Sequence, residues 1–268
     1  MKKNKIPKVI HYCWFGKNPL PELAVKCINS WKKYCPDYEI IEWNENNFDL
    51  NSVTYVKEAY EAKKWAFITD YVRLFVLYEY GGVYMDTDVE LLKPIDSFLT
   101  LDAFSGFESS NAVPTGIISS RKNFKFIKEL LDYYNDKHFK NDDGTYDLTT
   151  NVVTITNICL KHGLVINNKK QNIDGFILFP NDYFCPKDYI TGEIIKTDNT
   201  YAIHHFSGSW QNNFDKLMIK FEKKCIKIFN NKKGHKIYLF LSLPFRLVHF
   251  VYVNGLKKTI KKIISKFK

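Results

Sequence analysis

The segment 80–88, which reads Tyr-Gly-Gly-Val-Tyr-Met-Asp-Thr-Asp, constrains the fold of this chain more than any other. A glycine pair ends a helical pattern, residues 83–85 form a short apolar strand, and Asp86 and Asp88 follow that strand at once. Ligands of open α/β sheets bind beyond the carboxyl ends of the strands. Two carboxylates there suit Mg²⁺ or Mn²⁺, with phosphate oxygens completing the coordination. We therefore predict a metal and phosphate site, although such a triplet also occurs as a solvated acidic turn.

The apolar pattern of the first 215 residues predicts an α/β fold. Residues 6–15 read as a strand, a helix runs from residue 22 to about 34, and residues 38–43 read as a second strand, which together make a βαβ opening. No linker-like stretch interrupts this part, so we expect one domain over residues 1–215. Further helices are expected at 53–64, 66–80, 124–134 and 152–161, and further strands at 104–107, 115–119, 177–179 and 201–205.

A charged pair precedes the acidic segment on the helix expected over residues 66–80. Asp70 and Arg73 are three residues apart and therefore share a helix face. A surface ion pair of this kind would contribute only about 0–1 kcal/mol to stability. The functional interpretation is a carboxylate that binds sugar hydroxyls beside a guanidinium, whose rigid fork can serve two oxygens at once.

The run from Ala66 to Asp88 resembles the signature of the DXD-containing glycosyltransferases of family 32. That family includes bacterial capsular polysaccharide transferases and fungal outer-chain mannosyltransferases, and the large clostridial glucosylating toxins resemble it more distantly. Residues 6–16 and 204–210 resemble the family's first strand and its late block. The resemblance implies a GT-A-type open mixed sheet flanked by helices. It also implies a nucleoside diphosphate sugar donor, most simply a UDP-hexose, a bound Mn²⁺ or Mg²⁺, and retention of the anomeric configuration.

The resemblance also implies roles for individual residues. Trp14 matches the aromatic residue that lines the nucleobase site, with a core tryptophan as the alternative. Asp70 and Arg73 match the pair that contacts the donor sugar. Asp86 matches the carboxylate that touches ribose and sugar and approaches the metal, and Asp88 matches the direct metal ligand. Asp70, Arg73 and Asp86 are therefore the candidate catalytic residues.

The late block and the middle of the chain supply further candidates. His204 and His205 point to opposite sides if the backbone is extended. We assign His205 to the metal, while either histidine could instead belong to the core. Ser209 and Trp210 match positions that reach the metal shell and the β-phosphate, and Asn111 is a candidate on the acceptor side.

The C-terminal residues 216–268 differ from the rest in charge. They hold 15 of the 39 Lys and Arg residues and one acidic residue, so the remainder has a small acidic excess despite the net charge of +10. We predict a basic helical extension that associates with an anionic membrane surface. Residues 257–268 form an amphipathic pattern, and the apolar stretch 237–253 is interrupted by Pro244, Arg246 and His249. The alternative is a helix packed on the catalytic domain. Nucleic acid is not an expected partner, because the basic residues do not line the acidic body.

The expected protein is a retaining hexosyltransferase that extends a surface or capsular glycan of a bacterium, with a lipid-linked acceptor. Six scattered cysteines without CxxC spacing indicate reduced thiols, and no secretory signal is evident, so we expect a cytoplasmic enzyme held at the inner face of the membrane. Two alternatives stay open. One is a toxin-like transferase that glycosylates a host protein, and the other is a non-catalytic sugar- or lipid-binding protein on the same fold.

Overall fold

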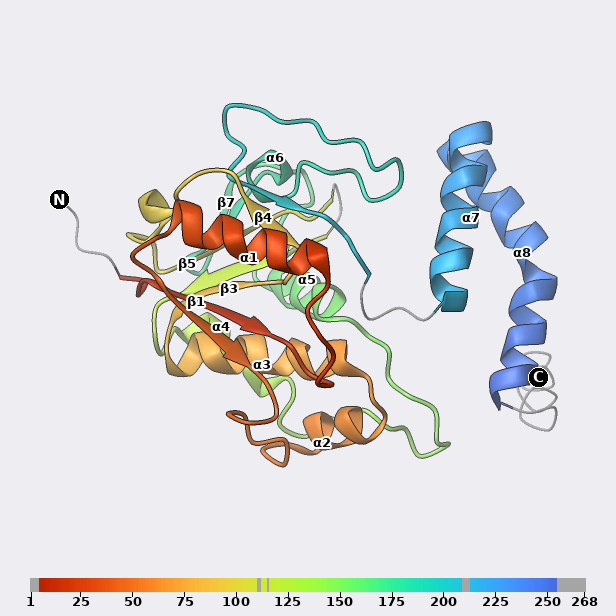
Figure 1. Cartoon of the computed structure of the whole chain (residues 1–268), viewed down its shortest axis with the longest axis horizontal. Coiled ribbons are helices and arrows are strands. Elements are labelled where there is room, and N and C mark those ends of the chain that lie inside the picture. The colour runs from red at the N-terminus through yellow and green to blue at the C-terminus, as the bar shows by residue number, and fades with distance from the viewer. Residues whose placement is uncertain (1–4, 110–111, 115, 209–212, 255–268) are drawn as a thin grey trace. The chain divides into compact units, whose positions relative to one another are not determined.

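The computed structural model describes residues 5–109, 112–114, 116–208 and 213–254. The chain divides into two compact units, residues 1–210 and residues 211–268, and each is described by itself (Figure 1).

The first unit is built on a seven-stranded mixed sheet with the order β2-β1-β3-β6-β5-β8-β7. The pairs β1–β2, β1–β3 and β5–β8 are parallel, whereas β3–β6, β5–β6 and β7–β8 are antiparallel. The predicted open mixed sheet flanked by helices is therefore confirmed. The strands are β1 (Val9–Cys13), β2 (Glu39–Trp43), β3 (Gly82–Met85), β5 (Ala103–Gly106), β6 (Ile117–Ser120), β7 (Gln171–Ile173) and β8 (Phe176–Phe179).

Helices cover both faces of this sheet, and alternate residues of each strand face opposite sides (Figure 1). Within β3, Val83 and Met85 join the apolar cluster that contains α1. Tyr84 between them joins the larger cluster under α2, α3, α4 and α5. The helices are α1 (Glu22–Tyr34), α2 (Thr54–Glu61), α3 (Trp65–Glu79), α4 (Lys125–Asp132), α5 (Asn151–Lys161) and α6 (Asn181–Phe184), with a 3₁₀ turn at Asp96–Phe98.

The glycine pair between α3 and β3 permits a close approach of two backbones. Gly81 and Gly82 have φ angles of +70° and +113°. A Cβ atom on Gly82 would lie 2.7 Å from the carbonyl oxygen of Val9, so a side chain there would push β3 away from β1. This tight turn sets β3 into the middle of the sheet, and its carboxyl end leads directly to Asp86.

A second, two-stranded sheet lies beside the first. β4 (Val89–Leu91) pairs antiparallel with β9 (Ala202–His204), so that Val89 stands opposite His204. The hydrogen bond from His205 N to Asp88 O, at 2.9 Å, extends this pairing by one residue. The late block of the sequence is thereby brought next to the acidic segment that follows β3.

The second unit contains a helical hairpin of α7 (Asn213–Phe229) and α8 (Asn231–Asn254). Its small core consists of Met218, Cys225 and Tyr238, with Phe214, Phe221 and Ile237 packed around them. Across the part of the chain that is described, no helix has both the length and the apolar character needed to cross a membrane. The amphipathic stretch expected over residues 257–268 lies outside the described residues.

Candidate active site

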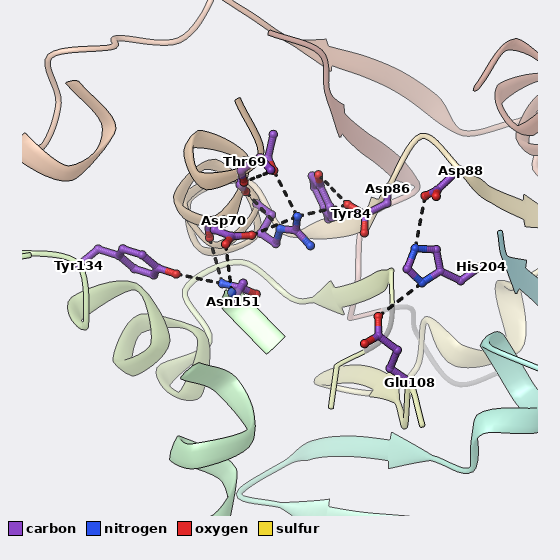
Figure 2. Close-up of polar contacts among 11 residues, drawn as sticks. Thr69, Asp70, Tyr84, Asp86, Asp88, Glu108, Tyr134, Asn151 and His204 are labelled. Atoms are coloured by element: carbon purple, nitrogen blue, oxygen red, sulfur yellow. Dashed lines mark hydrogen bonds and ion pairs between the residues drawn. The ribbon is translucent and has the colours of Figure 1, made fainter. Parts of the chain in front are cut away.

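Asp86 and Asp88 lie in the turn that connects β3 to β4 (Figure 2). Asp86 N donates to Gly116 O at 2.8 Å, and Val89 N donates to Asp86 O at 3.0 Å, so both ends of the turn are held by backbone hydrogen bonds. The backbone N–H of Ser207 donates to Asp88 Oδ2 at 2.7 Å. The two carboxylates are therefore fixed by the main sheet on one side and by the chain after β9 on the other.

Asp86, Asp88 and His204 form a group that could hold a metal ion. One ligand atom of each lies within 4.8 Å of the others. His204 Nε2 lies 3.3 Å from Asp88 Oδ1, and this pairing raises the pKa of His204 and lowers that of Asp88 despite their burial. Two carboxylate oxygens and one imidazole nitrogen suit Mn²⁺ and leave positions for phosphate oxygens. Metal binding would require His204 to lose its proton, as is usual for imidazole ligands.

His205, which the sequence led us to assign to the metal, is not in this group, and the structure brings His204 to that place instead. Its Nε2 lies 2.8 Å from Glu90 Oε2, and Glu90 also binds Lys26. The physical reason is the alternation of side chains along an extended strand, because consecutive residues point to opposite sides. Of the two histidines, the sequence could not show which one faces the acidic turn.

Asp70 and Arg73 form a buried pair beside the acidic turn, not a surface ion pair. Their residues are 7% and 8% exposed. Arg73 Nη2 lies 3.4 Å from Asp70 Oδ1 and 3.2 Å from Asp86 Oδ1, so one guanidinium joins both carboxylates. Tyr84 packs beneath it, with the Arg73 guanidinium carbon 4.7 Å from the ring centroid. Burial raises the pKa of Asp70 to about 7, although Arg73 opposes the shift.

Asn151 at the first turn of α5 also contacts Asp70, although it was not among the candidate site residues. Its backbone N donates to Asp70 Oδ2 at 3.0 Å, and its Nδ2 donates to Asp70 O at 3.1 Å and to Tyr134 Oη at 3.2 Å. The beginning of α5 therefore holds both the carboxylate and the backbone of Asp70. Asn151 Oδ1 is buried and makes no hydrogen bond to the described residues.

Two further residues at the acidic turn were not predicted. Glu108, in the connection from β5 to β6, has an Oε1 atom 3.6 Å from His204 Nδ1, and burial raises its pKa. Gly116, which directly precedes β6, leaves space at the candidate metal group. A Cβ atom there would lie 3.1 Å from Asp86 Oδ2 and 3.2 Å from His204 Cδ2. The signal in the sequence was the resemblance of segments 107–111 and 116–118 to the acceptor-side region of the family, which did not single out either residue.

Trp14 lies just beyond β1 and is partly buried against the cluster that contains α1. Its Nε1 donates to Asn18 O at 2.6 Å, which holds the indole against the loop before α1. The structure therefore places Trp14 at the carboxyl end of β1, the neighbour of β3. Asn111, Ser209 and Trp210 lie outside the described residues, and their predicted roles stay predictions.

Residues 21–105 match a family model described as "Glycosyltransferase sugar-binding region containing DXD motif". The match covers α1 to the middle of β5 and includes Asp70, Arg73 and both aspartates of the acidic turn. The predicted resemblance to the DXD-containing glycosyltransferases is therefore confirmed.

Curated relatives agree with this match. Inositol phosphoceramide mannosyltransferase 3 of Schizosaccharomyces pombe is 28% identical over 130 residues, which cover 47% of this chain and 36% of the relative. An uncharacterized glycosyltransferase, L373, of Acanthamoeba polyphaga mimivirus is 26% identical over 82% of this chain and 90% of its own length. The chain spans about a third of the length of the yeast mannosyltransferases that it matches first, at 36% and 33%.

Among solved structures, a glycosyltransferase involved in glycosylation of the major capsid protein of PBCV-1 aligns with a TM-score of 0.41 at 16% identity. That alignment covers 76% of this chain and 95% of the other.

Proposed function

Because the chain carries the sugar-binding region of the DXD-containing glycosyltransferases, we propose that it is a metal-dependent glycosyltransferase that moves a hexose from a nucleoside diphosphate sugar to a hydroxyl group. The observation that carries the proposal is the assembly of Asp86, Asp88 and His204 within 4.8 Å of one another, beside the buried Asp70–Arg73 pair. The candidate metal ligands and the pair proposed for the sugar lie together beyond the carboxyl end of β3, where ligands of open α/β sheets bind, and this supports the proposal.

The residues divide into two groups by role. Asp86, Asp88 and His204 would hold a divalent ion, which when bound would offset the charge of the departing diphosphate. Asp70 offers carboxylate oxygens to sugar hydroxyls, and Arg73 keeps Asp70 and Asp86 together through its two ion pairs. Because these donors and charges are already in place before the reaction, they stabilise the transition state without reorganisation. In a reaction with retention, an oxygen of the diphosphate would take the proton of the incoming hydroxyl on the same face.

The relatives' names guide the choice of sugar and acceptor. The S. pombe relative is named a mannosyltransferase that acts on inositol phosphoceramide, a lipid. We therefore propose mannose as the first hexose to test, besides the UDP-hexoses that the resemblance suggests. We keep a lipid-linked glycan, such as a capsular or surface polysaccharide repeat, as the proposed acceptor, with the reaction at the cytoplasmic face of the membrane.

The test combines ligand binding with transfer. Mn²⁺ with the correct nucleotide sugar should raise the melting temperature, since a bound ligand stabilises the folded state. The Asp88→Asn variant should fold normally, lose this Mn²⁺-dependent rise and lose transfer to lipid-linked acceptors. Asp132→Asn is the matched control, because Asp132 is an exposed carboxylate of α4 paired only locally with Lys128 and Asn135. Full Mn²⁺-dependent transfer by Asp88→Asn would overturn the proposal, and transfer to protein acceptors alone would favour the toxin-like alternative.

A further inference from the structure

From residue 239 onward, α8 exposes large apolar side chains on most of its circumference. Between residues 239 and 252, eight of them are more than two-fifths exposed: Leu239, Phe240, Leu241, Leu243, Phe245, Leu247, Val248 and Tyr252. At 3.6 residues per turn these positions span about 240° of the helix. The remaining strip holds the exposed Arg246 and the residues that face α7, where Ser242 is buried and His249 stacks on Phe214 with ring centroids 3.7 Å apart. A helix that is apolar nearly all round is normally covered by protein or by lipid.

The hairpin itself does not account for these side chains. Its core uses Met218, Cys225 and Tyr238, which lie in α7 and in the first two turns of α8. Phe240, Val248 and Tyr252 are 79%, 71% and 86% exposed, so their contribution to that core is small. Substitution of such residues should therefore leave the hairpin folded.

The other helix of the hairpin carries a basic stripe, defined here as Lys216, Lys220, Lys224 and Lys227. These residues follow the helical spacing i, i+4, i+8 and i+11, and all four are exposed. Leu217 and Ile228, exposed as well, lie along one edge of the stripe. The buried face of α7, with Met218 and Cys225, points the opposite way. The hairpin thus combines a cationic face with a strongly apolar helix segment.

We propose that the α7–α8 hairpin docks the protein on an anionic lipid bilayer, with the exposed apolar side chains of residues 239–252 among the lipids and the lysines of the basic stripe attracted to the anionic headgroups. Charge complementarity is the reason for choosing an anionic bilayer, because residues 216–268 hold 15 Lys and Arg residues and only one acidic residue. Each lysine near an anionic surface strengthens binding about fivefold, and the attraction falls off within a Debye length.

The length of the apolar segment indicates whether the helix crosses the bilayer or enters one leaflet only. Fourteen helical residues extend about 21 Å, which is shorter than the ~30 Å hydrocarbon core of a bilayer. Moreover, a helix that only floats at the interface needs an apolar face on one side, whereas this segment is apolar on about two thirds of its circumference. The segment therefore enters one leaflet without crossing the membrane. This inference goes beyond the proposed transfer reaction and does not depend on it.

The experiment measures flotation of the full chain with vesicles of phosphatidylcholine alone or with phosphatidylglycerol, at low and high salt. We expect binding to anionic vesicles that weakens at least tenfold at high salt.

The triple variant Phe240→Ser, Leu243→Ser and Leu247→Ser should bind anionic vesicles at least tenfold more weakly at either salt concentration. The matched control replaces Leu148, Leu160 and Val165 by Ser, which are equally exposed apolar residues of the first unit. Replacing the four lysines of the basic stripe by Gln should reduce the salt dependence, whereas replacing Lys57, Lys122, Lys125 and Lys161 by Gln should not.

The depth of insertion is measured with an environment-sensitive fluorophore attached to an introduced cysteine. The six native cysteines are buried, so the fluorophore should label the introduced one. A fluorophore at Val248→Cys should shift to the blue on anionic vesicles, and one at Lys224→Cys should shift less. Equal binding to neutral vesicles, or unchanged binding by the apolar triple variant, would overturn the proposal. So would a blue shift at position 248 that grows with protein concentration in the absence of vesicles, because it would identify a second copy of the chain as the occupant. Vesicle binding needs neither donor nor metal, so these outcomes are independent of the transfer assay.

Discussion

Replacing Arg73 by Met should destabilise the first unit in a manner that depends on pH. The Arg73 guanidinium contacts Asp70 at 3.4 Å, Asp86 at 3.2 Å and the carbonyl oxygen of Thr69 at 3.1 Å. Methionine preserves the volume but leaves the buried Asp70 carboxylate without a cation. Removal of one partner of a buried ion pair typically costs about 3–5 kcal/mol. We expect a loss of this size at pH 8 in the free energy of unfolding.

The pH dependence follows from the pKa of Asp70, which is about 7 in the folded protein and 3.8 for an ordinary aspartate. A raised pKa means that the folded state holds the proton longer, so the contribution of Asp70 to stability falls as pH rises from about 4 to 7. Without Arg73 the pKa rises further, and the fall continues above pH 7. The penalty of Arg73→Met should therefore grow above pH 7 by up to about 1.4 kcal/mol per pH unit.

The measurement is guanidinium unfolding at pH 6 to 9, followed by tryptophan fluorescence. The described tryptophans all lie in the first unit, at positions 14, 31, 43 and 65. Arg121→Met is the control, because Arg121 pairs with Asp102 at 2.8 Å and both side chains are more than 30% exposed. The free energy of unfolding of that variant should fall by no more than about 1 kcal/mol, and this loss should change little between pH 6 and 9. Equal losses for the two variants, or a constant Arg73→Met penalty from pH 6 to 9, would refute the reasoning.

Two further predictions concern the candidate metal group and the contacts of Asp70. His204→Ala should abolish the thermal stabilisation by Mn²⁺, whereas His205→Ala should retain it; equal loss in a thermal-shift assay would contradict the assignment of His204. Asn151→Ala removes hydrogen bonds to Asp70 O and Tyr134 Oη, at about 1 kcal/mol each, and should lower both the unfolding midpoint and the rate of transfer. Tyr134→Phe removes only one of these bonds and should affect transfer less; if it slows transfer as much as Asn151→Ala, the contact with Asp70 is not the cause.

Much of the sheet could be predicted because its strands are short apolar runs bounded by turn residues. The strand expected at 83–85 is β3, and that expected at 115–119 is found at Ile117–Ser120. β4 was not predicted, because Val89–Leu91 has a charged residue at its centre and owes its conformation to pairing with β9. The order of the strands likewise depends on pairings between distant segments, which periodicity along one segment does not contain.

Some residues of the candidate site could likewise be predicted from the sequence, and others could not. Asp70, Arg73, Asp86 and Asp88 were candidates because they share one helix face or one turn and because the run from Ala66 to Asp88 resembles a family signature. Asn151 and Glu108 could not, since each acts through a contact with a residue far away in sequence: Asn151 is 81 positions from Asp70. His204 and His205 show the limit most clearly. They are adjacent in the sequence, and only the register of β9 against β4 decides which one faces the carboxylates.

The pairing of β4 with β9 also determines when the site can exist during synthesis of the chain. Asp88 is held by Ser207, which is translated 119 residues later, and the third candidate ligand is His204. Until β9 has emerged from the ribosome, the nascent chain has both aspartates but lacks the imidazole and the N–H that fix them, and β4 has no partner strand. A nascent chain stalled before residue 200 should therefore be unable to hold the ion tightly. The capacity to bind the proposed donor would then arise only when β9 has joined β4 and the first unit is almost entirely made.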